Sequence, residues 1–212
     1  MAQTVMKLPT EVYVQEITPD VFDIKICDCN KRLAGATRYF NCGYFAIEKG
    51  GKTLPVGNLA SGGVIYAQAK ENASWLNLAK HKLTTIYTTK DGKCGITKTD
   101  DLTSIQNLKT AISGIPIIVG GKYVSMEQIK SEGYFGDEVY DTWHGFLGIR
   151  HDKLVYVAMK CNFNAMCWAL VALGIYDAIK LDGGGSFILH DEKILKATDG
   201  NRRIHNIGIW EG

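Results

Sequence analysis

The segment Leu181-Asp182-Gly183-Gly184-Gly185-Ser186 decides the fold, and it lies late in a chain of 212 residues. The residues before it, from Tyr176, and after it, Phe187 to Leu189, are rich in strand-forming types, which predicts a strand on each side. Consecutive glycines cost conformational entropy, and a plain turn needs only one or two. We therefore expect a bend in which the backbone approaches another group closely and adopts φ angles barred to other residues.

The groups in this bend suit it to bind an anion. Backbone N–H groups in a glycine-rich bend can form an anion-binding concavity. Asp182 stands at the end of a strand, where a rigid element presents its carboxyl group, and Ser186 adds a hydroxyl. The pattern is neither a phosphate loop nor a dinucleotide fingerprint, because a strand follows it rather than a helix. An ordinary hairpin turn with a solvated Asp182 is the alternative interpretation.

Strands dominate the rest of the chain. Residues 12–14 and 21–26 predict a hairpin or two edge strands, and Asp91-Gly92 and His151-Asp152-Lys153 predict hairpin turns. Two helices are expected, at 101–111 and at 164–173, the second capped by Asn162 or Asn164 and ended at Gly174. We predict an α+β fold for residues 1–212, one domain with mixed, largely antiparallel sheets flanked by helices.

Composition excludes several classes of function. The chain has 24 basic and 22 acidic side chains and a net charge of +2, which gives no broad patch for a nucleic acid polymer or a membrane surface. No apolar run reaches about 20 residues, and the N-terminus lacks the pattern of a signal peptide, so we expect a cytoplasmic protein. Oligomers remain possible.

The cysteines predict neither a metal site nor a disulfide framework. The chain has six cysteines, which are expected to be free thiols in a reducing compartment. Cys27 and Cys29 are spaced too tightly for a zinc site, and no second Cys or His pair completes one. No metal and no cofactor are therefore expected, and the predicted ligand is a small phosphate-bearing molecule.

The glycine segment, with the helix and Tyr176-Asp177-Ala178-Ile179 before it, resembles the signature of the phosphodiester glycosidase family, which has short relatives in bacteria and their viruses. Other segments follow the family's order over about residues 35 to 210, after the N-terminal strands of residues 1–34. They are Asn41-Cys42-Gly43-Tyr44-Phe45, which resembles an Asn-Gly-Gly-Phe-Phe motif, Pro55-Val56-Gly57-Asn58, Ala111-Ile112-Ser113-Gly114, and the closing strand from Arg202 to Ile209.

The resemblance implies cleavage of a sugar C1–O–phosphate linkage through an oxocarbenium-like state. Asp182 is the candidate carboxylate, His144 a candidate proton shuttle, and Arg202 a candidate phosphate contact. The remaining members of the implied site orient hydroxyls or phosphate oxygens or shape the pocket. They are Asn41, Gly43, Asn58, Ser113, Gly183, Gly184, Gly185, Ser186 and Asn206.

Two departures from the family pattern affect the expected chemistry. His144 stands where the family has an arginine, and Met159-Lys160-Cys161 lacks the family's acidic residue. Glu132, Asp137 or Glu138 could supply the missing acid. The second hypothesis is therefore a non-catalytic protein that sequesters a nucleotide-derived signal, of ADP-ribose or cyclic type, in the same pocket.

Three of the candidate site residues also have an interpretation that involves no ligand. Asn41 could cap a turn beside Gly43. Arg202 and Arg203 could form a solvated surface pair. His144, beside Trp143, could be a packed interior residue.

Overall fold

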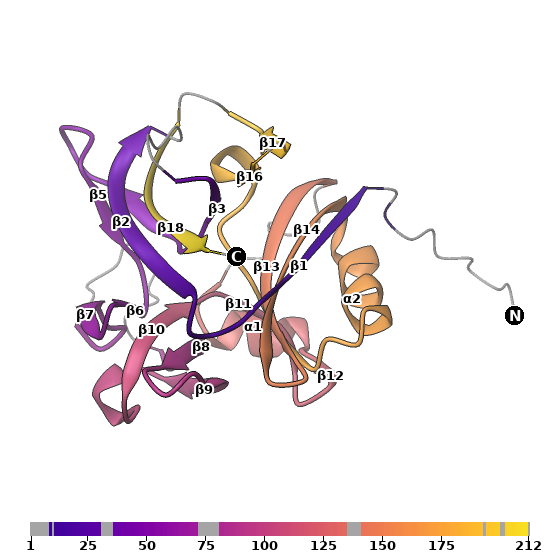
Figure 1. Ribbon diagram of the computed structural model, residues 1–212, viewed down its shortest axis with the longest axis horizontal. Coiled ribbons are helices and arrows are strands. Elements are labelled where there is room, and N and C mark those ends of the chain that lie inside the picture. The colour runs from indigo at the N-terminus through magenta and orange to yellow at the C-terminus, as the bar shows by residue number, and fades with distance from the viewer. Residues whose placement is uncertain are drawn as a thin grey trace, which may run out of the picture.

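The computed structural model describes residues 9, 11–30, 36–71, 81–134, 141–192, 194–199 and 202–211. In this part of the chain, three larger sheets and one small sheet form most of the structure (Figure 1). Every strand pair among the described residues is antiparallel, which confirms the expected largely antiparallel arrangement and shows none of the parallel pairs that mixed sheets would have. The fold is also richer in strand than an α+β domain flanked by helices.

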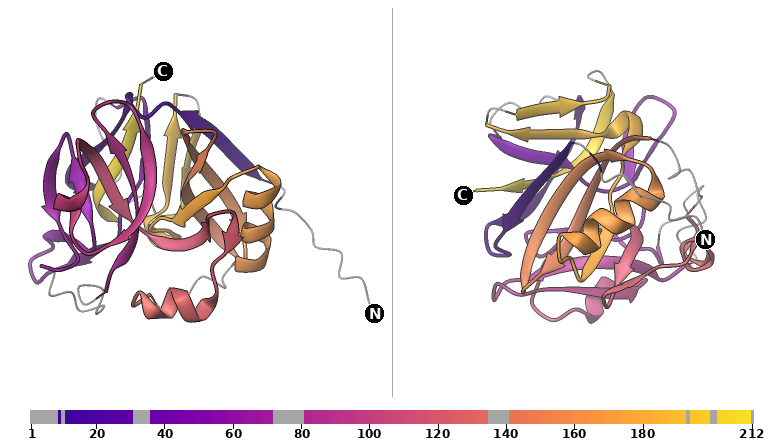
Figure 2. Two further views of the ribbon diagram at one scale, coloured as in Figure 1. Left: turned by 90° about the horizontal axis from the view of Figure 1, so that it is seen from below. Right: turned by 90° about the vertical axis from the view of Figure 1, so that its right-hand side faces the viewer.

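The first sheet has six strands and carries the longer helix, α2 (Phe163–Ala172). Its strand order is β1 (Val12–Ile17), β14 (Lys153–Cys161), β13 (Thr142–Arg150), β15 (Asp177–Lys180), β11 (Ile115–Val119) and β12 (Lys122–Tyr123). Met166 and Leu170 of α2 belong to one buried cluster with Val155 and Val157 of β14. Figure 2 shows α2 on the outer face of this sheet.

Two five-stranded sheets complete the frame. The second sheet has the order β7 (Val64–Ala67), β6 (Leu59–Ser61), β10 (Leu108–Ser113), β8 (Leu83–Thr89) and β9 (Cys94–Thr99). The third has the order β17 (Ile194–Ala197), β16 (Ile188–Asp191), β3 (Arg38–Asn41), β18 (Arg203–Trp210) and β2 (Phe22–Asn30). A two-stranded sheet, β4 (Phe45–Ile47) with β5 (Thr53–Pro55), and the short helix α1 (Met126–Ser131) are added to them.

The core lies where the three sheets face one another. One buried cluster joins Phe40 of the third sheet, Tyr156 of the first and Ile112 of the second. The rings of Phe40 and Tyr156 stack with their centroids 3.8 Å apart. Leu181 and Phe187, which flank the glycine segment, belong to the same cluster, so the core fixes both ends of that segment.

Several expected elements are present. The hairpins at Asp91-Gly92 and at His151-Asp152 join β8 to β9 and β13 to β14. The Asn162 side chain accepts from the N–H of Ala165 and caps α2, and Gly174 follows the helix at φ 71°. Residues 12–14 and 21–26 belong to β1 and β2, which are edge strands of different sheets rather than a hairpin.

The expected helix at 101–111 is wrong. Asp101 does cap a helical turn, but that turn is a 3₁₀ helix of residues Leu102–Ser104. Asn107 then adopts a positive φ of 53°, and Leu108–Ser113 forms β10 between two neighbouring strands. Strand pairing on both sides of β10 outweighs the helical period of this segment.

In the described residues, no helix has the length and apolar character that crossing a membrane requires.

Candidate functional site

The glycine segment connects the first sheet to the third. It leaves β15, turns through a 3₁₀ helix at Gly184–Ser186 and enters β16. The N–H of Ser186 donates to the carbonyl of Gly183 at 3.0 Å, and that of Phe187 donates to the carbonyl of Gly184 at 3.2 Å. We call residues 182–186 the glycine bend.

The three glycines of the bend differ in backbone conformation and in the space around them. Gly184 has φ 54°, the left-handed region, with open space around its Cα. Gly183 has an extended backbone, with φ −143°. A Cβ at Gly185 would lie 2.8 Å from Nη1 of Arg202, so this glycine makes room for the arginine. The expectation of special φ angles therefore holds for Gly184, and close approach explains Gly185, whereas neither the φ angle nor the space around Gly183 requires a glycine there.

The carboxyl group of Asp182 is the centre of the site. Burial raises its pKa, and this outweighs the lowering by Ser186, Lys180, Arg202 and the N–H of Gly183. That N–H donates to Oδ1 at 2.9 Å. Asp182 as a whole residue is partly exposed, although its carboxyl group is desolvated. A carboxyl group whose proton is held more tightly than usual is a candidate for acid–base chemistry.

His144 lies beside the bend from the neighbouring strand β13. Its side chain is buried, and Nδ1 lies 3.6 Å from the position that a Cβ on Gly183 would take. Its ring centroid is 6.3 Å from that of Phe146. His144 is thus both a packed interior residue and a neighbour of the glycine bend.

Arg202 is more than a surface cation. Its residue is exposed, yet its guanidinium lies against Gly185, and its charge lowers the pKa of the Asp182 carboxyl group. The simpler interpretation, a solvated pair with Arg203, therefore does not describe Arg202. A guanidinium in this position can bind phosphate oxygens.

Two buried asparagines hold the backbone around the site. Asn41 donates from Nδ2 to the carbonyl of Asp182 and accepts at Oδ1 from the N–H of Ile188, at 2.9 Å. Asn206 accepts at Oδ1 from the N–H of Gly43, at 2.6 Å, and its Nδ2 lies 3.0 Å from Nδ1 of His205. Both amide groups thus position the backbone around the site, and their expected contact with a ligand stays a prediction.

Asn58 and Ser113 form a separate cluster. The Ser113 hydroxyl accepts from the N–H of Asn58 at 3.0 Å, and Asn58 donates to Thr85 Oγ1 at 2.9 Å. The N–H of Ala69 donates to Asn58 Oδ1 at 2.9 Å. These bonds fasten segments of the second sheet together, which accounts for both residues without a ligand.

Sequence reasoning missed Lys180 and Tyr44. Lys180 is only 5% exposed, and its Nζ donates to the Tyr44 hydroxyl at 3.2 Å and to the carbonyl of Leu181 at 3.3 Å. From sequence alone, a lysine within a predicted strand is expected to be exposed at the surface. The available signal was its place at the end of the predicted strand, two residues before Asp182.

Of the three residues expected as candidates for a second acid, the structure describes Glu132. Glu132 is fully buried and accepts from the N–H and the hydroxyl of Thr84, at 2.7 and 2.9 Å. It also pairs with Lys98 at 3.0 Å. Asp137 and Glu138 lie outside the described residues.

Cys42 is buried, and burial raises the pKa of its thiol well above the ordinary value, so it is not a reactive thiolate. Within the described ranges, no group of three or more His, Cys, Asp and Glu residues could hold a metal ion.

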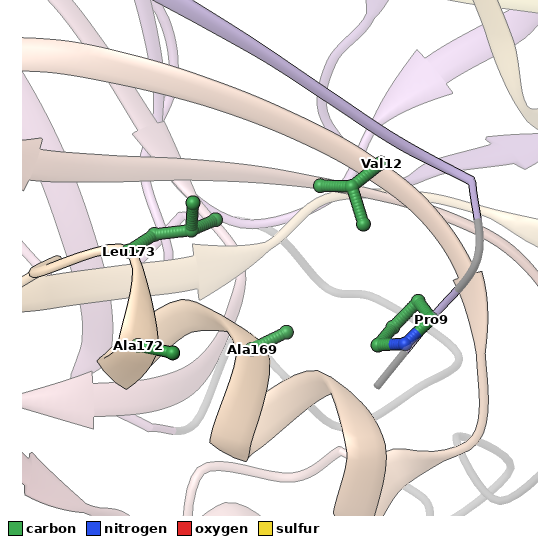
Figure 3. Close-up of a pocket in the computed structure, with 5 residues that line it drawn as sticks. All are labelled: Pro9, Val12, Ala169, Ala172 and Leu173. Atoms are coloured by element: carbon green, nitrogen blue, oxygen red, sulfur yellow. The ribbon is translucent and has the colours of Figure 1, made fainter. Parts of the chain in front are cut away.

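An apolar cavity of about 180 Å³ lies elsewhere, between α2 and the start of β1 (Figure 3). It is lined by Pro9, Val12, Ala169, Ala172 and Leu173. The described residues that line it are all apolar and none belongs to the glycine bend, so the candidate site is placed at the bend.

The candidate site is thus a desolvated aspartate on a glycine bend between antiparallel sheets, with the imidazole of His144 and the cations Lys180 and Arg202 beside it. The phosphodiester glycosidase family matches residues 35–209 by its sequence model. The chain therefore belongs to the phosphodiester glycosidase family.

Solved structures share the fold. The catalytic domain of zebrafish N-acetylglucosamine-1-phosphodiester α-N-acetylglucosaminidase, auto-inhibited by its pro-peptide, is 16% identical with a TM-score of 0.71, covering 99% of this chain and 85% of that one. A hypothetical protein from Synechocystis is 13% identical with a TM-score of 0.60, covering 93% and 58%. A comparison with curated proteins finds no match.

Proposed function

We propose that the protein is a phosphodiester glycosidase that hydrolyses a small sugar-phosphate or nucleotide-sugar-like molecule at the glycine bend. The observation that carries the proposal is the Asp182 carboxyl group, whose pKa burial raises although the residue stays partly exposed. Such a carboxyl group can give a proton or stabilise positive charge on the sugar. Family membership supports the reaction class.

The neighbouring groups fit the charge that develops in this reaction. A phosphodiester leaving group needs little protonation and gains most from donors that receive negative charge. Arg202, which lies against Gly185, supplies such a donor. His144, whose Nδ1 lies beside Gly183, has ring nitrogens that can donate or accept a hydrogen bond.

The test is mass spectrometry of sugar phosphodiesters and ADP-ribose-like nucleotides after incubation with the protein. We expect a free reducing sugar from wild type and none from Asp182→Ala. Asp20→Asn, an exposed acidic position, is the matched control and should retain activity. Equal product from wild type and Asp182→Ala would contradict the proposal.

One observation favours the second hypothesis, a protein that binds a nucleotide-derived ligand without cleaving it. Glu132, a candidate second acid, is committed to Thr84 and Lys98, while a typical glycosidase needs two carboxyl groups. The same incubation separates the hypotheses. A binding protein depletes the intact ligand from solution and returns it unchanged after heating.

The cellular location, the source and the domain organisation of the protein stay predictions. We propose that the protein works in the cytoplasm as a short bacterial or phage member of the family, formed by one domain over residues 1–212. A small phosphate-bearing ligand is its proposed partner.

A further inference from the structure

The helix α2 carries apolar side chains on its outer side as well as on the side that packs on the first sheet. The side chains buried against the sheet are those of Met166, Cys167, Ala169 and Leu170. On the outer side, Trp168 is 50% exposed and Val171 is 41% exposed. A helix that is apolar all round is normally buried on all sides. The outer face of α2 therefore has the composition of a surface that is covered by another molecule.

This part of the chain also has no charge of its own. The residues from Cys161 to Tyr176 include no charged side chain, in a sequence of which 22% is charged. A two-fold symmetric contact places the same patch of both subunits together, so like charges in it would face each other. An uncharged face avoids this repulsion, whereas a face that selects a different protein usually carries complementary charges. The absence of charge on α2 therefore favours a second copy of this chain as the partner.

The outer face combines a protruding ring with a cavity. The ring of Trp168 meets that of Tyr123 in β12, with their centroids 6.0 Å apart. One helical turn later, Ala172 lines the apolar cavity of about 180 Å³ together with Val12 (Figure 3). An apolar cavity of about 150 Å³ accepts a benzene molecule, so this one has the volume for the six-membered ring of an indole. Because Trp168 and Ala172 are four residues apart, they lie on the same side of the helix.

Ring and cavity are complementary when two copies meet with their α2 helices antiparallel. A two-fold axis that passes α2 at the level of Leu170 sets Trp168 of one copy opposite the partner's Ala172. The same axis sets the partner's Trp168 opposite Ala172 of the first copy, so both contacts form at once. Alanine at this position allows the two helices to approach closely, and the face is therefore complementary to itself.

The exposed area suits a homodimer. A fully buried aromatic side chain covers about 150–250 Å², so the half-exposed rings of Trp168 and Tyr123, with Val12 and Val171, offer on the order of 300 Å² of apolar surface. A standard interface buries about 800 Å² on each partner, and about 65% of a homodimer interface is apolar, which gives roughly 500 Å². Four side chains thus provide more than half of the apolar surface that a stable homodimer needs.

We propose that the outer face of α2 is the contact surface of a two-fold symmetric homodimer, in which Trp168 of each copy enters the apolar cavity of the other. This inference does not rest on the proposed function, because neither α2 nor the residues that line the cavity belong to the glycine bend. Hydrolysis of a sugar phosphodiester is measured separately and bears on neither outcome of the test.

The test is sedimentation velocity of the full chain over about 1–100 μM, a range in which an interface of this size forms. We expect wild type to dimerise. Trp168→Glu should weaken the dimer by roughly 30-fold per contact, and by roughly 1000-fold in all because the dimer contains the contact twice. Tyr66→Glu is the matched control, since Tyr66 is 51% exposed on β7 of the second sheet, and it should leave the dimer intact.

A second variant tests the two-fold geometry. Ala172→Lys, at another exposed position of α2, should weaken the dimer on its own, which tests the contact even if Trp168→Glu fails to fold. An equal mixture of Trp168→Glu and Ala172→Lys should dimerise more strongly than either variant alone. In the mixed dimer one glutamate faces one lysine, and the other contact keeps its native tryptophan and alanine.

Recovery of the dimer in the mixture supports the inference. A wild type that stays monomeric at about 100 μM overturns it, and the face would then belong to a different protein or a lipid surface. A dimer that both single substitutions leave unchanged also overturns it, because the copies would then meet through another surface. A dimer that both substitutions weaken and the mixture does not restore contradicts the two-fold pairing of Trp168 with the partner's Ala172.

Discussion

At the scale of single residues, Asp182 is expected to carry the reaction. Asp182→Asn keeps an oxygen that can accept from the N–H of Gly183 but removes the titrating proton. We expect turnover of a sugar phosphodiester to fall by about 10²–10⁴-fold, the usual contribution of a positioned acid or base. Ligand affinity should change far less, since the cations remain. Steady-state kinetics with parallel binding measurements check this, and equal losses in both would assign Asp182 to binding.

The same substitution should change stability in a pH-dependent way. Burial raises the pKa of the Asp182 carboxyl group above its unfolded value, so the folded protein binds this proton more tightly. The stability from this group is present below the unfolded pKa and is lost as pH rises through the folded pKa. Asp182→Asn should therefore be more stable than wild type at pH 7, and the gap should close toward pH 4. Urea unfolding at several pH values measures the difference in unfolding free energy between the variant and wild type. A difference that does not change with pH would contradict the raised pKa of Asp182.

The glycines should respond separately to alanine. Gly184→Ala meets no atom but forces a side chain into the left-handed region, at a cost of about 1–2 kcal/mol of unfolding free energy. Gly185→Ala should cost less, because the atom it meets is the mobile end of Arg202, yet it should weaken dimethyl phosphate binding by displacing that guanidinium. Urea unfolding and NMR titration of both variants check this. If Gly184→Ala weakened ligand binding and left the unfolding free energy unchanged, the conformational role assigned to Gly184 would be wrong.

At the scale of elements, Asn41 is expected to hold the bend to β16. Its side chain satisfies the carbonyl of Asp182 and the N–H of Ile188 in a buried position. Asn41→Ala leaves both backbone groups without these bonds and should lower the unfolding free energy by about 2–4 kcal/mol. Asn164→Ala, an exposed position in α2, should change it by no more than about 0.5 kcal/mol. If Asn41→Ala and Asn164→Ala both changed the unfolding free energy by a similar, small amount, the bend would not depend on Asn41.

The same elements show how far the sequence could predict the site. The glycine bend, both hairpins and the α2 cap follow from local chemistry, since glycine, Asp-Gly and Asn each act within a few residues. Strand β10 could not be recovered from its own residues, because its partners β6 and β8 decide its structure. Lys180 was missed for the same reason. Its burial results from packing between β13 and β11, which only the tertiary structure brings together.

At the scale of the molecule, the site exists because two sheets meet at the glycine bend. His144 and Lys180 lie on β13 and β15 of the first sheet, whereas Asn41 and Asn206 lie on β3 and β18 of the third. The bend is one covalent link between these sheets, the turn from β1 to β2 being another, and the N–H of Asp182 donates to the carbonyl of Cys42 across the junction, at 3.1 Å. A ligand that contacts both sides should therefore bind them to each other.

This geometry predicts that a ligand protects both sheets together. At a ligand concentration of about 100 times Kd, the folded state should gain about 2.7 kcal/mol by mass action. Amide hydrogen exchange should slow in the bend and also in β13 and β3, which are far apart in sequence. Wild type with trimethyl phosphate is the control and should show little protection, because that ligand lacks the charge. Protection confined to the bend would mean that the ligand contacts one sheet only, and that the junction has no part in recognition.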